Sequence, residues 1–139
     1  MGAVGQPLEG MRVLLVEDAA DIREIFGILL RMEGAEVVAT PSGRGAARRL
    51  RRERFDVLLT DLGLPDFPGE MVIALAAQAR PRPWIVVVTG YDEPHLSAAW
   101  KAGADAVLTK PVEWRVLLDR LTGREAPAAV ASSSSSRAA

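Results

Sequence analysis

The stretch FDVLLTDLGLP at residues 55–65 decides the fold. Residues 55–60 are apolar nearly throughout, instead of alternating between apolar and polar side chains. Strands that are covered on both faces need this composition, and such strands belong to parallel sheets with helices on each side. The runs at residues 12–16 and 84–89 have the same character. Together the three runs predict the centre of a parallel sheet.

Outward from this centre, runs of strand length alternate with stretches of helical spacing. Ile22, Ile25, Phe26, Leu29 and Leu30, for example, recur at the spacing of one helix face. The predicted strands are residues 12–16, 35–39, 55–60, 84–89 and 104–108, and the predicted helices are residues 20–33, 43–53, 69–79, 94–102 and 112–121. Five repeats of strand and helix predict a doubly wound α/β domain.

The composition indicates one ordinary domain without a strong charge. A chain of 139 residues has the length of a single domain, and its formal charge is −1. This balance gives no reason to expect binding to nucleic acid or to a membrane surface. The absence of Cys excludes disulfides and thiol catalysis, and no apolar run approaches the roughly 20 residues of a membrane span. We expect a cytoplasmic protein.

Three segments differ in composition along the chain. Residues 1–9 are expected to form an N-terminal extension, and residues 10–121 the folded domain. Residues 122–139 contain a serine run and many small residues but no periodic apolar face, which predicts a disordered tail or linker. A natural linker, a connection to another domain and an artificial addition all remain open for this segment.

Acidic, hydroxyl and basic residues end four of the predicted strands. Glu17 and Asp18 follow the first strand, Asp61 the third, Thr89 ends the fourth and Lys110 follows the fifth. Ligands of open parallel sheets bind beyond the carboxyl ends of the strands, so these side chains are expected to meet. Three crowded carboxylates repel one another unless a cation joins them, and oxygen ligands suit Mg²⁺. The pattern therefore predicts a magnesium site.

Phosphoryl chemistry follows from this arrangement. An Asp carboxylate can act as the nucleophile that forms an aspartyl phosphate, and Asp61 is the central candidate. Thr89 could donate a hydrogen bond to one phosphoryl oxygen, and Lys110 could hold another as a point charge. Taken singly, each residue also has an ordinary interpretation: acids open helices, and Asp, Gly and Pro form turns. The combination on successive strand ends favours a site.

Four pieces of the sequence match a known family pattern: VLLVED at 13–18, DVLLTDLGLPDFPG at 56–69, VVVTGYD at 86–92 and AGADAVLTKP at 102–111. With them the sequence resembles the receiver domain of two-component response regulators over residues 10–121, and more narrowly a single-domain, chemotaxis-regulator-like receiver. The resemblance implies a flavodoxin-like sheet of strand order 2-1-3-4-5 with five helices. It makes Asp61 the phosphoacceptor and Thr89 and Lys110 the residues that bind the phosphoryl group. It also implies Mg²⁺ ligation by Glu17, Asp18, Asp61 and the backbone carbonyl of Gly63, and a cis peptide bond before Pro111.

Some positions depart from the family pattern. Val107 stands where the family most often carries an aromatic residue that turns inward on activation, so the readout of phosphorylation is expected to differ. Gly63 and Tyr91 occupy positions whose side chains tend to tune dephosphorylation. Trp100 lies near the end of the fourth predicted helix, and with Val107 it marks a possible output face. Val107 also motivates an alternative, a binding scaffold that works without phosphorylation.

The implied function is signal transduction. A sensor histidine kinase or a histidine phosphotransfer protein would supply the phosphoryl group to Asp61, and the output would be contact with a downstream protein. An Asp-nucleophile phosphohydrolase is the third hypothesis, but such enzymes carry a second acid where this chain has Gly63, so we expect at most self-phosphorylation and self-dephosphorylation. The arginines at 48, 49, 51, 52 and 54 are interpreted as a solvated helix face, and His95 as a surface residue.

Overall fold

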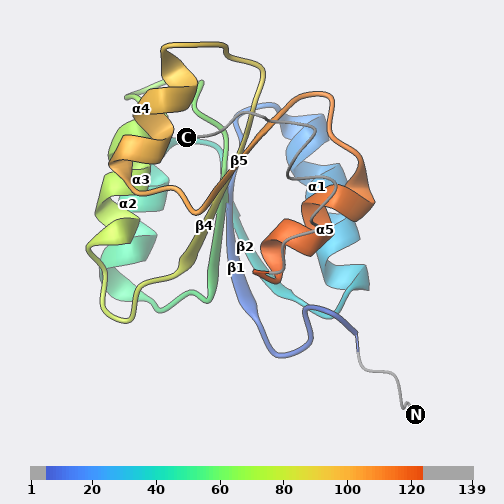
Figure 1. Cartoon of the computed structure of the whole chain (residues 1–139). Helices are drawn as coiled ribbons and strands as arrows, with labels where there is room; N and C mark the ends of the chain where they lie inside the picture. The colour runs from blue at the N-terminus through green and yellow to red at the C-terminus, as the bar shows by residue number, and fades with distance from the viewer. Residues whose placement is uncertain (1–5, 124–139) are drawn as a thin grey trace.

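The computed structural model describes residues 6–123, which form five strands and five helices in strict alternation (Figure 1). In chain order these are β1 (Arg12–Val16), α1 (Ala20–Met32), β2 (Glu36–Thr40), α2 (Gly43–Arg52), β3 (Val57–Thr60), α3 (Gly69–Ala77), β4 (Trp84–Thr89), α4 (His95–Ala102), β5 (Ala106–Thr109) and α5 (Trp114–Leu121).

The strands form one parallel sheet in the order β2-β1-β3-β4-β5. Helices α1 and α5 cover one face, and α2, α3 and α4 cover the other (Figure 1). The order reverses between β1 and β3, which is where an open parallel sheet binds its ligands. The predicted doubly wound architecture and strand order are confirmed.

Each face of the sheet has its own apolar core, because successive strand residues point to opposite faces. Leu15 and Leu59 pack with Leu30 of α1 and Leu117 of α5. The second core forms under α2, α3 and α4 from Leu14, Leu58, Val72, Ile73, Ile85 and Val87. The central strands are buried on both sides, which explains why their sequences lack polar alternation.

Part of the predicted N-terminal extension packs against the domain. Leu8, which the sequence placed in an extension, is fully buried in the core beneath α1 and α5. Its backbone N–H donates to the carbonyl of Glu33, at 2.9 Å, and so ties the segment to the end of α1. The packed region therefore begins before residue 10. The predicted tail, apart from Thr122 and Gly123, lies outside the described residues.

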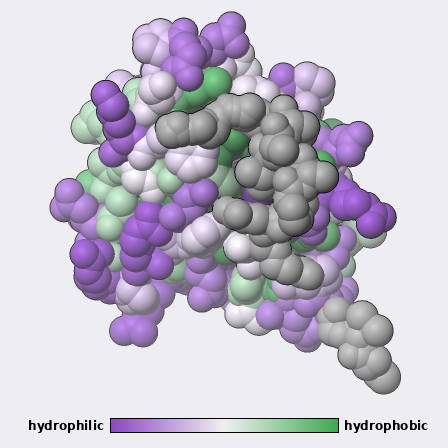
Figure 2. Space-filling view, viewed as in Figure 1, coloured by the Kyte–Doolittle hydropathy of each residue, from purple (hydrophilic) through white to green (hydrophobic). Residues whose placement is uncertain are grey.

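Both polar and apolar side chains are exposed at the surface. In Figure 2 polar residues line most of the visible margin, and apolar residues are scattered between them. Large apolar side chains that are exposed include Ile25, Ile28 and Met32 on α1, Met71 and Leu75 on α3, Tyr91, and Trp100 on α4. Within residues 6–123, none of the helices is long and apolar enough to cross a membrane.

Candidate functional site

Polar residues gather where the strands end at one edge of the sheet. Register places the last residues of β1 and β3 side by side, and those of β4 and β5 likewise, through the pairs Val16 with Thr60 and Thr89 with Thr109. Glu17 and Asp61 directly follow the first pair of strands. The topology therefore delivers acidic groups from the middle of the sheet and Lys110 from its edge to the same place.

Lys110 joins two carboxylates of this edge. Its Nζ donates to Asp61 Oδ2 at 2.9 Å and lies 3.5 Å from Glu17 Oε1. The side chains are 30% exposed for Lys110, 12% for Asp61 and 5% for Glu17, so water reaches the lysine and Asp61 more easily than Glu17. Burial by itself would lower the pKa of Lys110, but its hydrogen bond to Asp61 and the two negative charges raise it.

The Asp61 carboxylate is held at both of its oxygens. While Oδ2 accepts from Lys110, Oδ1 accepts from the backbone N–H of Leu62 at 2.6 Å and from that of Gly63 at 3.3 Å. The Thr60 hydroxyl donates to the Asp61 carbonyl at 2.8 Å. These bonds fix the direction of the carboxylate and leave its remaining lone pairs at the partly open edge.

Glu17 is the most buried acid of the group. One oxygen accepts from the backbone N–H of Ala19 at 3.1 Å, and the other faces Lys110. Burial raises the pKa of Glu17, since the apolar surroundings disfavour its charged form more strongly than these partners favour it. A cation placed beside Glu17 would relieve that cost.

The structure does not gather all three predicted metal carboxylates. Asp18 is exposed, and within residues 6–123 no three His, Cys, Asp or Glu side chains form a group that could hold a metal ion. Lys110 instead stands beside Glu17 and Asp61 and offsets their repulsion. The donor set still fits Mg²⁺ chemically: all of its groups are oxygen donors, and three carboxylates against one ammonium leave negative charge for a divalent cation to balance.

Thr89 ends β4 with a fully buried side chain. Its Oγ1 accepts the backbone N–H of Tyr91 at 3.1 Å, which uses a lone pair and leaves the hydroxyl hydrogen to donate. Thr89 also binds the backbone of the residue after β5, because its carbonyl accepts the Lys110 N–H at 2.9 Å. The hydroxyl and the ammonium are therefore positioned by one short stretch of sheet.

A comparison with models of protein families identifies the family of this chain. The family model described as "Response regulator receiver domain" matches residues 13–122. This chain belongs to the response regulator receiver family. The fold, the strand order and the polar edge of the sheet are thus those of a receiver.

Relatives and solved structures agree with this assignment. The response regulator protein FleR of Pseudomonas aeruginosa is 34% identical over 109 residues, which cover 78% of this chain but only 23% of FleR. A CheY-like receiver domain protein from Methanospirillum hungatei JF-1 superposes with a TM-score of 0.77 at 32% identity, over 81% of this chain and 91% of that one.

A third relative was crystallised with a metal. The receiver domain of the sensor histidine kinase PA1611 from P. aeruginosa PAO1 has a TM-score of 0.72 and 27% identity, over 82% of this chain and 98% of that one. In that structure a magnesium ion is coordinated in the active site cleft.

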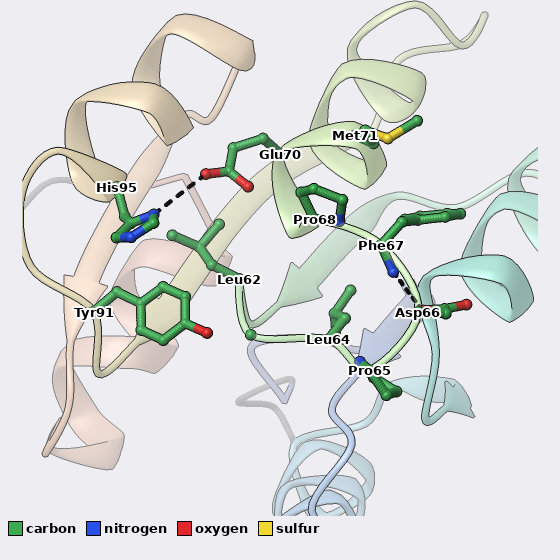
Figure 3. Close-up of a pocket in the computed structure, with 11 residues that line it drawn as sticks. Leu62, Leu64, Pro65, Asp66, Phe67, Pro68, Glu70, Met71, Tyr91 and His95 are labelled. Atoms are coloured by element: carbon green, nitrogen blue, oxygen red, sulfur yellow. Dashed lines mark hydrogen bonds and ion pairs between the residues drawn. The ribbon is translucent and has the colours of Figure 1, made fainter.

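A hollow of about 670 Å³ lies beside the site of this receiver, between the β3–α3 loop and the start of α4 (Figure 3). Tyr91 and His95 form one wall, with ring centroids 4.7 Å apart, and His95 Nδ1 lies 3.8 Å from Glu70 Oε2. The Tyr91 hydroxyl stands so near Gly63 that a Cβ there would come within 2.8 Å of it. The ring of Tyr91 therefore covers one side of the loop that follows Asp61.

The two residues of the predicted output face differ in their surroundings. Val107 lies in β5, is half-buried, and packs against the core beneath α2, α3 and α4. Trp100 is 46% exposed on α4. The Lys110–Pro111 peptide bond is cis.

Two residues near the site were not predicted from the sequence. Arg23 of α1 donates to the carbonyl of Glu17 at 2.8 Å and reaches the carbonyl of Asp18 at 3.4 Å, so it braces the acidic loop. Asp66 holds the β3–α3 loop against α2. An Arg in the first turns of a helix gives no signal of such a bond, and Asp66 stands in a Pro- and Gly-rich segment whose ordinary interpretation is a turn.

Proposed function

We propose that this receiver accepts a phosphoryl group on Asp61 in a Mg²⁺-dependent reaction and thereby switches its contacts with other proteins. The proposal depends on the hydrogen bond that Lys110 Nζ donates to Asp61 Oδ2 at 2.9 Å. The other oxygen of this carboxylate already accepts from backbone N–H groups. An ammonium at this distance stands next to the place where phosphoryl oxygens would arrive.

The reaction forms one bond and breaks another. An Asp61 oxygen attacks phosphorus of a phosphohistidine, the phosphorus–nitrogen bond breaks, and its electron pair stays on the imidazole nitrogen, which takes up a proton. Lys110 then pairs with a phosphoryl oxygen instead of the free carboxylate, and the Thr89 hydroxyl donates to another oxygen. Both groups stabilise charge that spreads over the transferred oxygens.

The metal would be held by Asp18, Asp61 and the carbonyl of Gly63, with Glu17 as the buried acid that positions it. When bound, Mg²⁺ supplies charge stabilisation at the phosphoryl oxygens. The magnesium ion in the receiver of PA1611 supports this proposal.

A sensor histidine kinase or a histidine phosphotransfer protein is the proposed phosphodonor, and a protein of unknown identity the proposed target. Self-dephosphorylation completes the cycle, and Gly63 leaves no second acid for turnover of outside substrates. The proposed organisation keeps residues 10–121 as the receiver, and Leu8 of the preceding segment packs into its core. The matched relatives are covered over 23% to 92% of their length, so both a stand-alone regulator and a receiver within a larger protein fit.

The test uses a small phosphodonor and a phosphoryl mimic. Acetyl phosphate with Mg²⁺ should label the wild type, and beryllium fluoride should change its tryptophan fluorescence in a Mg²⁺-dependent manner. Asp61→Asn should lose both responses. Asp92→Asn, which alters an exposed acid in the loop after β4, should keep both. A wild type without label and without a Mg²⁺-dependent response would contradict the proposal.

Val107 favours a second candidate, a scaffold that binds its partner without phosphorylation. Because no aromatic side chain stands at this position, the surface near α4 and β5 lacks the usual switching group. Equal affinity of one partner for the wild type, the beryllium fluoride complex and Asp61→Asn would support this candidate. A difference of tenfold or more, about 1.4 kcal/mol, would exclude it.

A further inference from the structure

The loop that follows Asp61 is tied sideways to α2. The carboxylate of Asp66 binds the first two N–H groups of that helix: Oδ1 accepts from Gly43 at 2.8 Å and Oδ2 from Arg44 at 2.7 Å. Its Oδ1 also accepts from the N–H of Phe67 at 3.1 Å. A side chain of the phosphoacceptor loop therefore caps a helix that begins 23 residues earlier in the chain.

Packing reinforces this cap. The ring of Phe67 lies directly against Gly43, and a Cβ on Gly43 would overlap the ring. Figure 3 shows Asp66 and Phe67 beside the start of α2. Since Gly43 is buried, the loop and the helix meet without space for a further side chain.

The loop is also closed at its base. The carbonyl of Leu62 accepts from the N–H of Leu64 at 3.0 Å and from that of Gly69, the first residue of α3, at 3.1 Å. A Cβ on Gly69 would come within 2.7 Å of the Asp61 carbonyl oxygen. Residues 62–69 thus have one anchor at the end of β3 and a second at Asp66.

The charge of Asp66 suits this contact. Burial by itself would raise the pKa of Asp66, but the N–H groups of Arg44, Gly43 and Phe67 together lower it. The first turn of a helix also favours an anion. Asp66 therefore remains ionised at neutral pH, and its two bonds to α2 persist.

We propose that Asp66 is a positioning residue for phosphoryl acceptance: its cap on α2 holds the β3–α3 loop, and hence the Leu62 and Gly63 backbone, in the place that Asp61 requires. The inference rests on the proposed phosphoacceptor function. Asp61 Oδ1 is oriented by the N–H groups of Leu62 and Gly63, and the proposed metal carbonyl belongs to Gly63. A loop released from α2 would no longer fix these groups, and small misplacements of a reacting group slow reactions strongly.

The matched control is the second cap of the same helix. Ser42 Oγ accepts from the N–H of Gly45 at 3.0 Å, so Ser42→Ala also removes a cap from α2 but leaves the loop attached. The experiment compares Asp66→Ala, Asp66→Asn and Ser42→Ala with the wild type. It measures phosphorylation of Asp61 by saturating acetyl phosphate with Mg²⁺, and unfolding in urea.

Asp66→Ala should slow phosphorylation by about tenfold or more, whereas Ser42→Ala should stay within about twofold of the wild type. Asp66→Asn keeps one oxygen acceptor and should fall between the two. If Asp66→Ala does not fold, the comparison of Asp66→Asn with Ser42→Ala decides. Equal rates in the Asp66 and Ser42 variants would overturn the inference. A wild type that takes up no phosphoryl group would instead refute the proposed function.

Discussion

Lys110 shows why a lysine serves this edge of the sheet. Its single ammonium lies 2.9 Å from Asp61 Oδ2 and 3.5 Å from Glu17 Oε1, so one compact charge serves two carboxylates. An arginine would bring a planar fork that prefers two parallel bonds to one carboxylate. The difference can be tested by exchanging lysine for arginine. The one other lysine of the chain, Lys101, is exposed on α4 and provides a control.

We expect Lys110→Arg to lower phosphorylation of Asp61 by acetyl phosphate by about tenfold or more, since a charge-assisted bond contributes about 1.5–3 kcal/mol. Lys110→Met should lower it at least as much. Lys101→Arg should have no effect. Label incorporation over time measures all three, and a Lys110→Arg variant as fast as the wild type would show that charge alone is enough.

Glu17 should make stability depend on pH. The raised pKa means that folded protein binds a proton at Glu17 more tightly than unfolded protein does, so the free energy of unfolding falls as pH rises above the ordinary glutamate pKa of about 4.3. Glu17→Gln should show a smaller fall. Urea unfolding at several pH values, with a chelator present to remove metal ions, measures the difference. Glu24→Gln, at an exposed position of α1, is the control.

Mg²⁺ should offset the loss of stability that the buried charge of Glu17 causes. At neutral pH, added Mg²⁺ should raise the stability of the wild type more than that of Glu17→Gln, because a ligand that binds only the folded state stabilises it. An equal rise in both proteins would mean that Glu17 has no part in metal binding.

The bounds of some strands could be predicted from the sequence, and those of others could not. The predicted bounds of β1 and β4 agree with the structure, whereas β3 begins at Val57, two residues later than predicted. Phe55 is buried, and Asp56 bonds through its backbone to Arg12 and Trp84, yet the residue pairs that β3 forms with β1 and β4 begin only at Val57. Apolarity indicates burial, and only backbone pairing defines a strand.

Close packing at the start of α3 gives a prediction for this element. A Cβ on Gly69 would lie 2.6 Å from the Cα of Leu62, and backbone cannot move away as a flexible side chain can. Gly69→Ala should therefore destabilise the protein by about 1–3 kcal/mol. Gly90→Ala is the control, since nothing stands within 4 Å of its Cβ position. Urea unfolding compares the two, and equal stabilities would contradict the model of a closed loop.

Because each face of the sheet has its own core, we expect substitutions in either core to destabilise the whole domain. Leu58 and Leu59 are neighbours in β3, yet they belong to opposite cores. Each substitution by Ala should cost about 2–5 kcal/mol, whereas Leu75→Ala at a 44% exposed site should cost far less. Unfolding followed by circular dichroism should remain a single transition in all variants. A large effect in only one core would show that the faces are unequal.

At the level of the complete fold, the sequence predicted the architecture because alternation, strand apolarity and strand-end residues all agree. The sequence also predicted that side chains from different strand ends meet at one edge, and the structure places Lys110 beside Glu17 and Asp61. Their roles in phosphorylation stay predictions. The Asp66 cap could not be predicted, because it joins segments that are distant in sequence and depends on how the loop packs against α2.

The burial of Leu8 has a practical consequence for attachment. Leu8 binds the backbone at the end of α1, just before β2 begins, and Gly123 lies near the ring of Trp84 at the start of β4. Both limits of the described chain therefore lie at the edge where strands begin, opposite Asp61 (Figure 1). A receiver immobilised on a sensor chip, or joined to a fluorescent reporter, through either limit would present its carboxylates to the solution. Donor and target proteins could then be measured without obstruction by the tether.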